Sequence, residues 1–124
     1  MMGNIRAIQW TADGWPVVQP ERYAGVPKTV ITDASIVGSW EQITLRYQYA
    51  VQQKSSVLVL SADKKVSGDV TSTWSYDSAT RLLTINGVVC MVTEAWDWEA
   101  PVRKVTLTYS GINSAGVTIW AKKI

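Results

Sequence analysis

The chain has 124 residues, which fits a single domain, with 47% hydrophobic residues, 18% charged residues and a net charge of +2. This composition argues against disorder, and no basic run exceeds two residues, so a nucleic-acid-binding surface is not expected. The absence of histidine excludes histidine general bases, histidine metal ligands and Ser-His-Asp triads, and we expect neither a metal nor a cofactor.

The aromatic residues are seven Trp and five Tyr, with no Phe. Trp and Tyr are favoured where a ring packs on one side and meets a polar partner on the other, as in a barrel core or on a sugar-binding surface. The single cysteine, Cys90, lies in an apolar run and is expected to be a buried, inert thiol that reveals no redox compartment. The N-terminus has no signal-peptide core and no apolar run approaches the roughly 20 residues of a membrane span, so we expect a soluble chain without a membrane partner.

Residues 1–37 hold three of the four prolines and show little alternation. Because proline does not suit a central strand, this segment is predicted to be an extended arm or linker with one strand, over residues 5–10. The Asp-Gly pair at 13–14 suits a tight turn, and Trp15 is held extended by the proline that follows it. The aromatic rings of the arm are expected to anchor it against another surface.

Residues 38–124 alternate apolar and polar side chains with a period of two, and no window shows a helical stripe. Asn86-Gly87 lies between two apolar runs and is a strong hairpin signal, because both residues tolerate the positive φ of a type I′ turn. Residues 110–116 are expected to be a connection. The pattern predicts about eight strands in an antiparallel sandwich or barrel, including segments 43–51, 57–60, 70–76, 83–85, 88–93, 105–109 and 117–122.

The arm contains a characteristic order of residues: an Arg-containing strand, a Trp, Asp-Gly-Trp-Pro, two apolar residues and Pro-Glu-Arg-Tyr. The positions are Arg6, Trp10, Asp13, Gly14, Trp15, Pro16, Val17, Val18, Pro20, Glu21, Arg22 and Tyr23. This pattern resembles the segment that ends the catalytic propeller of two-domain endo-α-1,5-L-arabinanases of glycoside hydrolase family 43.

Further segments, at 38–40, 66–68, 74–77, 83–87, 95–99 and 119–123, resemble in the same order the C-terminal lipocalin-like module of those enzymes. The resemblance covers nearly the whole chain. It implies an all-β fold, in which a single antiparallel barrel of about eight strands (38–124) follows the arm (1–37). Trp40, in the Gly-x-Trp opening of the first long strand, is expected to plug one end of the barrel.

The resemblance further implies a non-catalytic accessory domain that packs on the catalytic propeller and supports its substrate cleft. The catalytic carboxylates of the family lie on the propeller, and no position here matches their motifs. The expected docking residues are Trp10, Asp13, Trp15, Pro16, Arg22 and Tyr23. Without the propeller, the arm would leave a hydrophobic patch and would dimerise, exchange between copies or fold onto its own barrel. A secreted bacterial parent would make the protein extracellular.

The segment 94–99 leaves two alternatives open. Glu94, Asp97 and Glu99 flank two Trp residues, which is the kind of arrangement that a glycosidase site uses, although carboxylates beside Trp are also common for solubility. Trp96 and Trp98 share strand parity and could stack on sugar rings, which would make the chain an independent carbohydrate-binding module for arabinan-type polysaccharide. In that case Trp96, Asp97 and Trp98 would contact the sugar.

A third alternative is a barrel whose lumen holds a small apolar ligand, as lipocalin-like barrels often do. Large side chains are predicted on the inward faces, and they would fill an eight-stranded barrel rather than leave a cavity. These predicted inward residues are Leu45, Tyr47, Trp74, Leu107 and Trp120.

Overall fold

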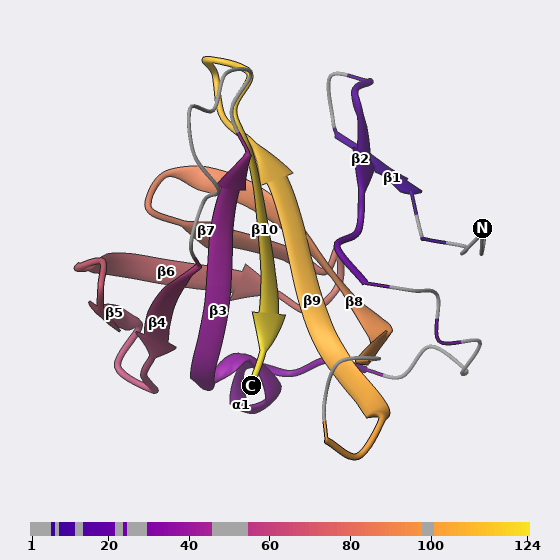
Figure 1. Ribbon diagram of the computed structural model, residues 1–124. Coiled ribbons are helices and arrows are strands. Elements are labelled where there is room, and N and C mark those ends of the chain that lie inside the picture. Colours follow the sequence, from indigo (N-terminus) through magenta and orange to yellow (C-terminus); the bar gives the residue numbers. More distant parts are fainter. Residues whose placement is uncertain are drawn as a thin grey trace.

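The computed structural model of the chain describes residues 6, 8–11, 14–21, 24, 30–45, 55–97 and 101–124. Within these residues, eight antiparallel strands close into a barrel in the order β10-β3-β4-β5-β6-β7-β8-β9 (Figure 1). The all-β antiparallel barrel expected from the sequence is therefore confirmed. Its strands are β3 (Gly38–Leu45), β4 (Ser56–Leu60), β5 (Lys65–Gly68), β6 (Ser72–Asp77), β7 (Leu82–Ile85), β8 (Val88–Asp97), β9 (Lys104–Ile112) and β10 (Thr118–Lys123).

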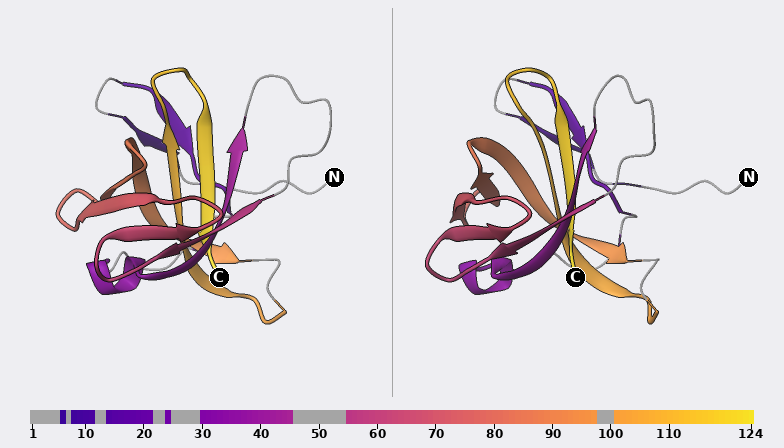
Figure 2. Two further views of the ribbon diagram at one scale, coloured as in Figure 1. Left: turned by 90° about the vertical axis from the view of Figure 1, so that its left-hand side faces the viewer. Right: turned by 60° about the vertical axis from the view of Figure 1, so that its left-hand side comes forward.

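The arm contributes three short elements. Strands β1 (Ile8–Trp10) and β2 (Pro16–Val18) pair as an antiparallel two-stranded ribbon, which lies beside β9 (Figures 1 and 2). Helix α1 (Asp33–Ile36) was not predicted, because four residues are too few to show a helical period. It places the fully buried Ile36 in the barrel core.

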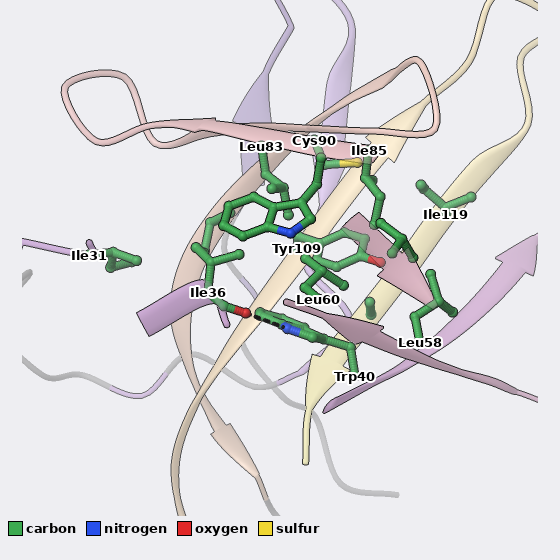
Figure 3. Close-up of a cluster of buried hydrophobic side chains, with 14 residues drawn as sticks. Ile31, Ile36, Trp40, Leu58, Leu60, Leu83, Ile85, Cys90, Tyr109 and Ile119 are labelled. Atoms are coloured by element: carbon green, nitrogen blue, oxygen red, sulfur yellow. Dashed lines mark hydrogen bonds between the residues drawn. The ribbon is translucent and has the colours of Figure 1, made fainter. Parts of the chain in front are cut away.

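Two aromatic rings fill the centre of the barrel. Trp40 and Tyr109 are fully buried, with ring centroids 5.1 Å apart, and the Trp40 indole Nε1 donates a hydrogen bond to the carbonyl oxygen of Ile36 at 2.9 Å (Figure 3). Trp40 is thus a buried core residue, and its indole N–H is satisfied by the carbonyl oxygen of Ile36 in helix α1. The remaining core residues are Ile31, Leu58, Leu60, Val66, Trp74, Leu83, Ile85, Cys90, Val92, Ile119 and Ala121.

The predicted set of inward side chains is only partly correct. Trp74 is in the core and Leu107 packs against it, but Trp120 alternates with the core residues Ile119 and Ala121 and therefore faces outward. Leu45 lies opposite Thr118 and also falls on the outer face. Alternation divides a strand into two faces without showing which face is inside, and the strand register shows it. Tyr47 lies outside the described residues.

Two connections test the turn predictions. Asn86 and Gly87 have φ of +50° and +77° between β7 and β8, so the predicted hairpin is confirmed. The predicted connection at 110–116 begins too early, because β9 continues to Ile112. Glycine at 111 serves packing in the strand, since a Cβ there would lie 2.7 Å from the Cys90 Sγ.

Candidate functional site

One face of the ribbon is apolar and exposed. Ile8 pairs with Val18 and Trp10 with Pro16, so these four side chains share a face. Trp15, which directly precedes β2, is also exposed. The exposed fractions are 66% for Trp10, 62% for Trp15 and 56% for Ile8. We call these five residues the ribbon patch. A contiguous cluster of large apolar side chains that is exposed at a protein surface often marks an interaction site.

A tight turn fixes the two Trp residues of the patch. The Thr11 amide donates to the Trp15 carbonyl oxygen at 2.8 Å, and the Trp15 amide donates to the Thr11 Oγ1 at 2.9 Å. Gly14 has a φ of +88°, which glycine adopts at no steric cost. The expected turn is therefore present, although Asp13 itself lies outside the described residues.

The opposite face of the ribbon is fixed to the barrel wall by a buried glutamine. Gln19 is fully buried, and its Nε2 donates to the Met91 carbonyl oxygen at 3.2 Å, while its Oε1 accepts from the Thr108 Oγ1 at 3.0 Å. The Ser110 Oγ donates to the Val18 carbonyl oxygen at 3.0 Å. The outward-facing side chains of β8 and β9 are buried here because the arm lies against them.

A buried ionic cluster holds the next part of the arm. The Lys122 Nζ lies 3.2 Å from the Asp97 Oδ1 and 3.4 Å from the Glu21 Oε1. The three side chains are only 14%, 6% and 15% exposed, respectively. Ion pairs shielded from water are screened far less than surface pairs, so this cluster ties the arm to both β8 and β10.

Arg6 makes a third attachment. Its guanidinium lies 5.7 Å from the ring centroid of Trp120 and also donates to the Pro20 carbonyl oxygen. Trp120 therefore faces outward and contacts the arm through a cation–π interaction with Arg6, rather than packing in the core.

The predicted docking residues are placed as follows. Trp10 and Pro16 are paired across the ribbon, and Trp10, Trp15 and Pro16 are all exposed. Arg22 and Tyr23 lie outside the described residues, as does Trp98 of the predicted sugar-contacting set.

The other two predicted sugar-contacting residues point in opposite directions. Asp97 faces the outer wall, where it pairs with Lys122 beneath the arm. Trp96 lies opposite Val105 on the other face of β8, which is the face that carries the core residue Val92 further along the strand. Trp96 is partly buried. Strand parity thus separates two residues that are adjacent in sequence.

Glu94 shares the inner face with Trp96 and forms an ion pair with Arg81, with nitrogen–oxygen distances of 3.0 Å and 3.2 Å. Glu94 and Asp97 therefore bind different cations on opposite faces of β8. Glu99, the third candidate, lies outside the described residues.

Gln19, Thr108 and Lys122 were missed in the sequence, because their role depends on which wall of the barrel the arm crosses. The sequence signal that could have indicated them is the presence of polar residues at alternate positions of otherwise apolar strands. Within the described ranges, no three Cys, Asp or Glu residues gather as metal ligands would. No helix in the same part of the chain has the length and apolar character needed to cross a membrane.

Comparisons with known proteins agree on one group. The GH43_C family model, a C-terminal lipocalin-like domain, matches residues 20–121. The chain is 27% identical over 122 residues to the extracellular endo-α-(1→5)-L-arabinanase 2 of Bacillus subtilis strain 168, covering 97% of this chain and 26% of that protein.

Solved structures show the same fold. The family 43 glycoside hydrolase YxiA protein of Bacillus licheniformis superposes with a TM-score of 0.79 at 24% identity, over 98% of this chain and 28% of that one. The endo-1,5-α-L-arabinanase of Thermotoga petrophila RKU-1 superposes with a TM-score of 0.76 at 20% identity, over 96% of this chain and 28% of that one. The chain thus spans about a quarter of the length of these relatives.

Proposed function

Because the chain belongs to the family of C-terminal lipocalin-like domains of family 43 glycoside hydrolases, we propose that it is a non-catalytic accessory domain of an arabinan-degrading enzyme. In this role the ribbon patch packs on the catalytic propeller and supports one side of its substrate cleft. We further propose an extracellular location, on the basis of the Bacillus subtilis relative, which is described as extracellular.

The observation that carries the proposal is the two-sided construction of the arm. One side is fixed to the barrel by Gln19 and Lys122, while Trp10 and Trp15 are exposed to solvent. A rigidly held apolar surface loses little conformational freedom when it binds, which favours association. Trp side chains are also the residues most enriched at the energetic centres of interfaces.

The relatives favour the catalytic domain as the partner. Their similarity to this chain extends over 96–98% of it, so the arm is included, yet it accounts for only 26–28% of their own lengths. The arm is therefore matched in proteins that hold a much larger additional part. Support for a non-catalytic role comes from the lack of histidine and from the separate ion pairs of Glu94 and Asp97.

A chimera tests the proposal. The segment of the Bacillus subtilis arabinanase that aligns with this chain is replaced by the 124-residue chain, and debranched-arabinan hydrolysis and thermal unfolding are measured. We expect activity and one cooperative unfolding transition. Replacing Trp10 and Trp15 together by Ala should uncouple the two parts, with a loss of about 2 kcal/mol of coupling free energy for each side chain.

The matched control replaces Val57 and Val59 by Ala. These side chains are 41% and 36% exposed on the outer face of β4, so the control removes apolar surface away from the arm. Equal behaviour of the control and the double Trp variant would contradict docking through the ribbon patch. Arabinan hydrolysis by the 124-residue chain alone would contradict the non-catalytic role.

A further inference from the structure

The inner face of β8 and β9 continues past the core toward the ends of these strands. Glu94 lies opposite Leu107 and Trp96 opposite Val105, on the same side as the buried pair Val92 and Tyr109. We call Glu94, Trp96, Val105 and Leu107 the hairpin face. Its exposure increases outward, and Val105 is 40% exposed.

A charged pair borders the hairpin face. Glu94 and Arg81 pair through two nitrogen–oxygen contacts of 3.0 Å and 3.2 Å, with side chains only 10% and 19% exposed. The pair carries no net charge, so it does not select a charged ligand. Each carboxylate oxygen has two lone pairs, so Glu94 keeps acceptor capacity for a hydroxyl group.

Tyr76 adds an unsatisfied polar atom. It lies opposite Leu83, a core residue, and its buried hydroxyl has no hydrogen-bond partner among the described residues. The register places its ring on the inner face toward β8, because Tyr76 lies opposite Leu83 and Leu83 lies opposite Cys90. Burial raises the pKa of Tyr76 above its ordinary value. The hydroxyl is therefore a protonated donor at neutral pH. A buried hydroxyl without a partner is costly, and a bound ligand would remove that cost.

We propose that the hairpin face, together with Arg81 and Tyr76, binds a neutral polyhydroxylated ring, namely one sugar unit. Trp96 supplies an apolar surface for the ring's C–H groups, and Glu94 and Tyr76 bind its hydroxyl groups. The site differs from the set expected from the sequence, because Asp97 lies on the opposite face of β8. The choice of arabinan fragments as the probe rests on the proposed function, whereas the site's chemistry does not.

The test is an NMR titration of the ¹⁵N-labelled chain with α-1,5-linked arabinotriose, with cellotriose as the comparison sugar. We expect the amide signals of residues 94–96 and 105–107 and the Trp96 indole signal to shift together. Tyr76→Phe should weaken binding about fivefold, as the loss of one hydrogen bond predicts. Trp96→Ala should weaken it about tenfold, as the loss of an aromatic contact predicts.

Trp15→Ala is the matched control, since it removes an exposed Trp from the ribbon patch and should leave the affinity unchanged. If Trp96→Ala does not fold, Glu94→Gln replaces it and should also weaken binding. Absence of shifts with both sugars, shifts confined to the ribbon, or equal affinity of Tyr76→Phe and the unsubstituted chain would each overturn the site. Shifts at the hairpin face with cellotriose alone would support the site and count against the arabinan assignment. None of these outcomes bears on the proposed docking of the ribbon patch, because the chimera experiment that tests it does not involve Trp96.

Discussion

At the scale of single residues, close packing around Cys90 sets the chemistry of the barrel interior. The thiol is fully buried beside Gly111, and burial raises its pKa from 9.0 to about 12. Burial likewise raises the pKa of the Tyr109 hydroxyl, which hydrogen-bonds to Gln42. In both cases the folded protein favours the neutral form, because a charge in the core would be poorly solvated.

The Cys90 shift predicts a loss of stability at alkaline pH. The unfolded chain ionises the thiol from about pH 9, whereas the folded protein keeps its proton until about pH 12. The stabilising contribution is therefore complete below pH 9 and is lost as the pH rises from 9 to 12, at no more than about 1.4 kcal/mol per pH unit.

Urea unfolding at pH 8, 9 and 10 measures this effect in the chain and in Cys90→Ala. All other ionisable groups are shared, so the variant should lose stability less steeply above pH 9, whatever its absolute stability. Parallel pH dependences of the two proteins would show that the thiol ionises normally in the folded state.

The sequence predicts burial well where the local pattern is sufficient. Cys90 lies within an uninterrupted apolar run, and Trp40 follows a glycine at the head of a strand, so both could be placed in the core. Trp120 could not, because alternation defines two faces but does not say which is inside. Its outward direction follows from its alternation with the core residues Ile119 and Ala121, and its contact with Arg6 of the arm is a long-range one with no local signal.

At the scale of elements, the arm is joined to the barrel by polar groups as well as by the buried Val17. Gln19, Thr108 and Ser110 form buried hydrogen bonds, and Lys122 bridges Asp97 and Glu21. Polar contacts are directional, so they fix the position of the ribbon more tightly than apolar packing alone would. Apart from the buried Val17, the apolar residues of β1 and β2 lie on the other face of the ribbon.

Replacing Lys122 by Met should therefore destabilise the arm strongly. The change leaves two largely buried carboxylates without their shared cation, and we expect a loss of about 3 kcal/mol in the free energy of unfolding. The control is Lys65→Met, whose side chain is 72% exposed and lies 3.9 Å from Asp63. An exposed pair of this kind contributes less than about 1 kcal/mol.

Chemical denaturation of the two variants measures the difference. A loss in Lys122→Met no larger than in Lys65→Met would mean that the ionic cluster does not hold the arm.

The elements themselves were predicted unevenly. The β7–β8 hairpin was found because Asn86-Gly87 specifies its turn locally. The ribbon was predicted only as one strand and an extended run, since three-residue strands show too little alternation to reveal their pairing. Helix α1 is equally short, and its place in the barrel core depends on Ile36 meeting residues distant in sequence.

At the scale of the whole molecule, the fold is a barrel whose interior is filled by its own side chains. The ribbon of the arm covers part of the outer side of this barrel. The filled core weighs against an apolar-ligand lumen, and the arm turns the outer wall of β8 and β9 into a platform for Trp10 and Trp15. The family pattern in the sequence predicts these two Trp residues as docking residues. Their exposure and the polar attachment beneath them required the structure.

Amide hydrogen exchange of the ribbon tests the central claim most directly, because it reports whether that surface becomes covered. The exchange of residues 8–10 and 16–18 is compared between the isolated chain and the arabinanase chimera. We predict that docking slows exchange in these strands at least about tenfold in the chimera and leaves β4 and β5 unchanged. Equal exchange in the ribbon of both proteins, in a chimera that is folded and active, would contradict the account.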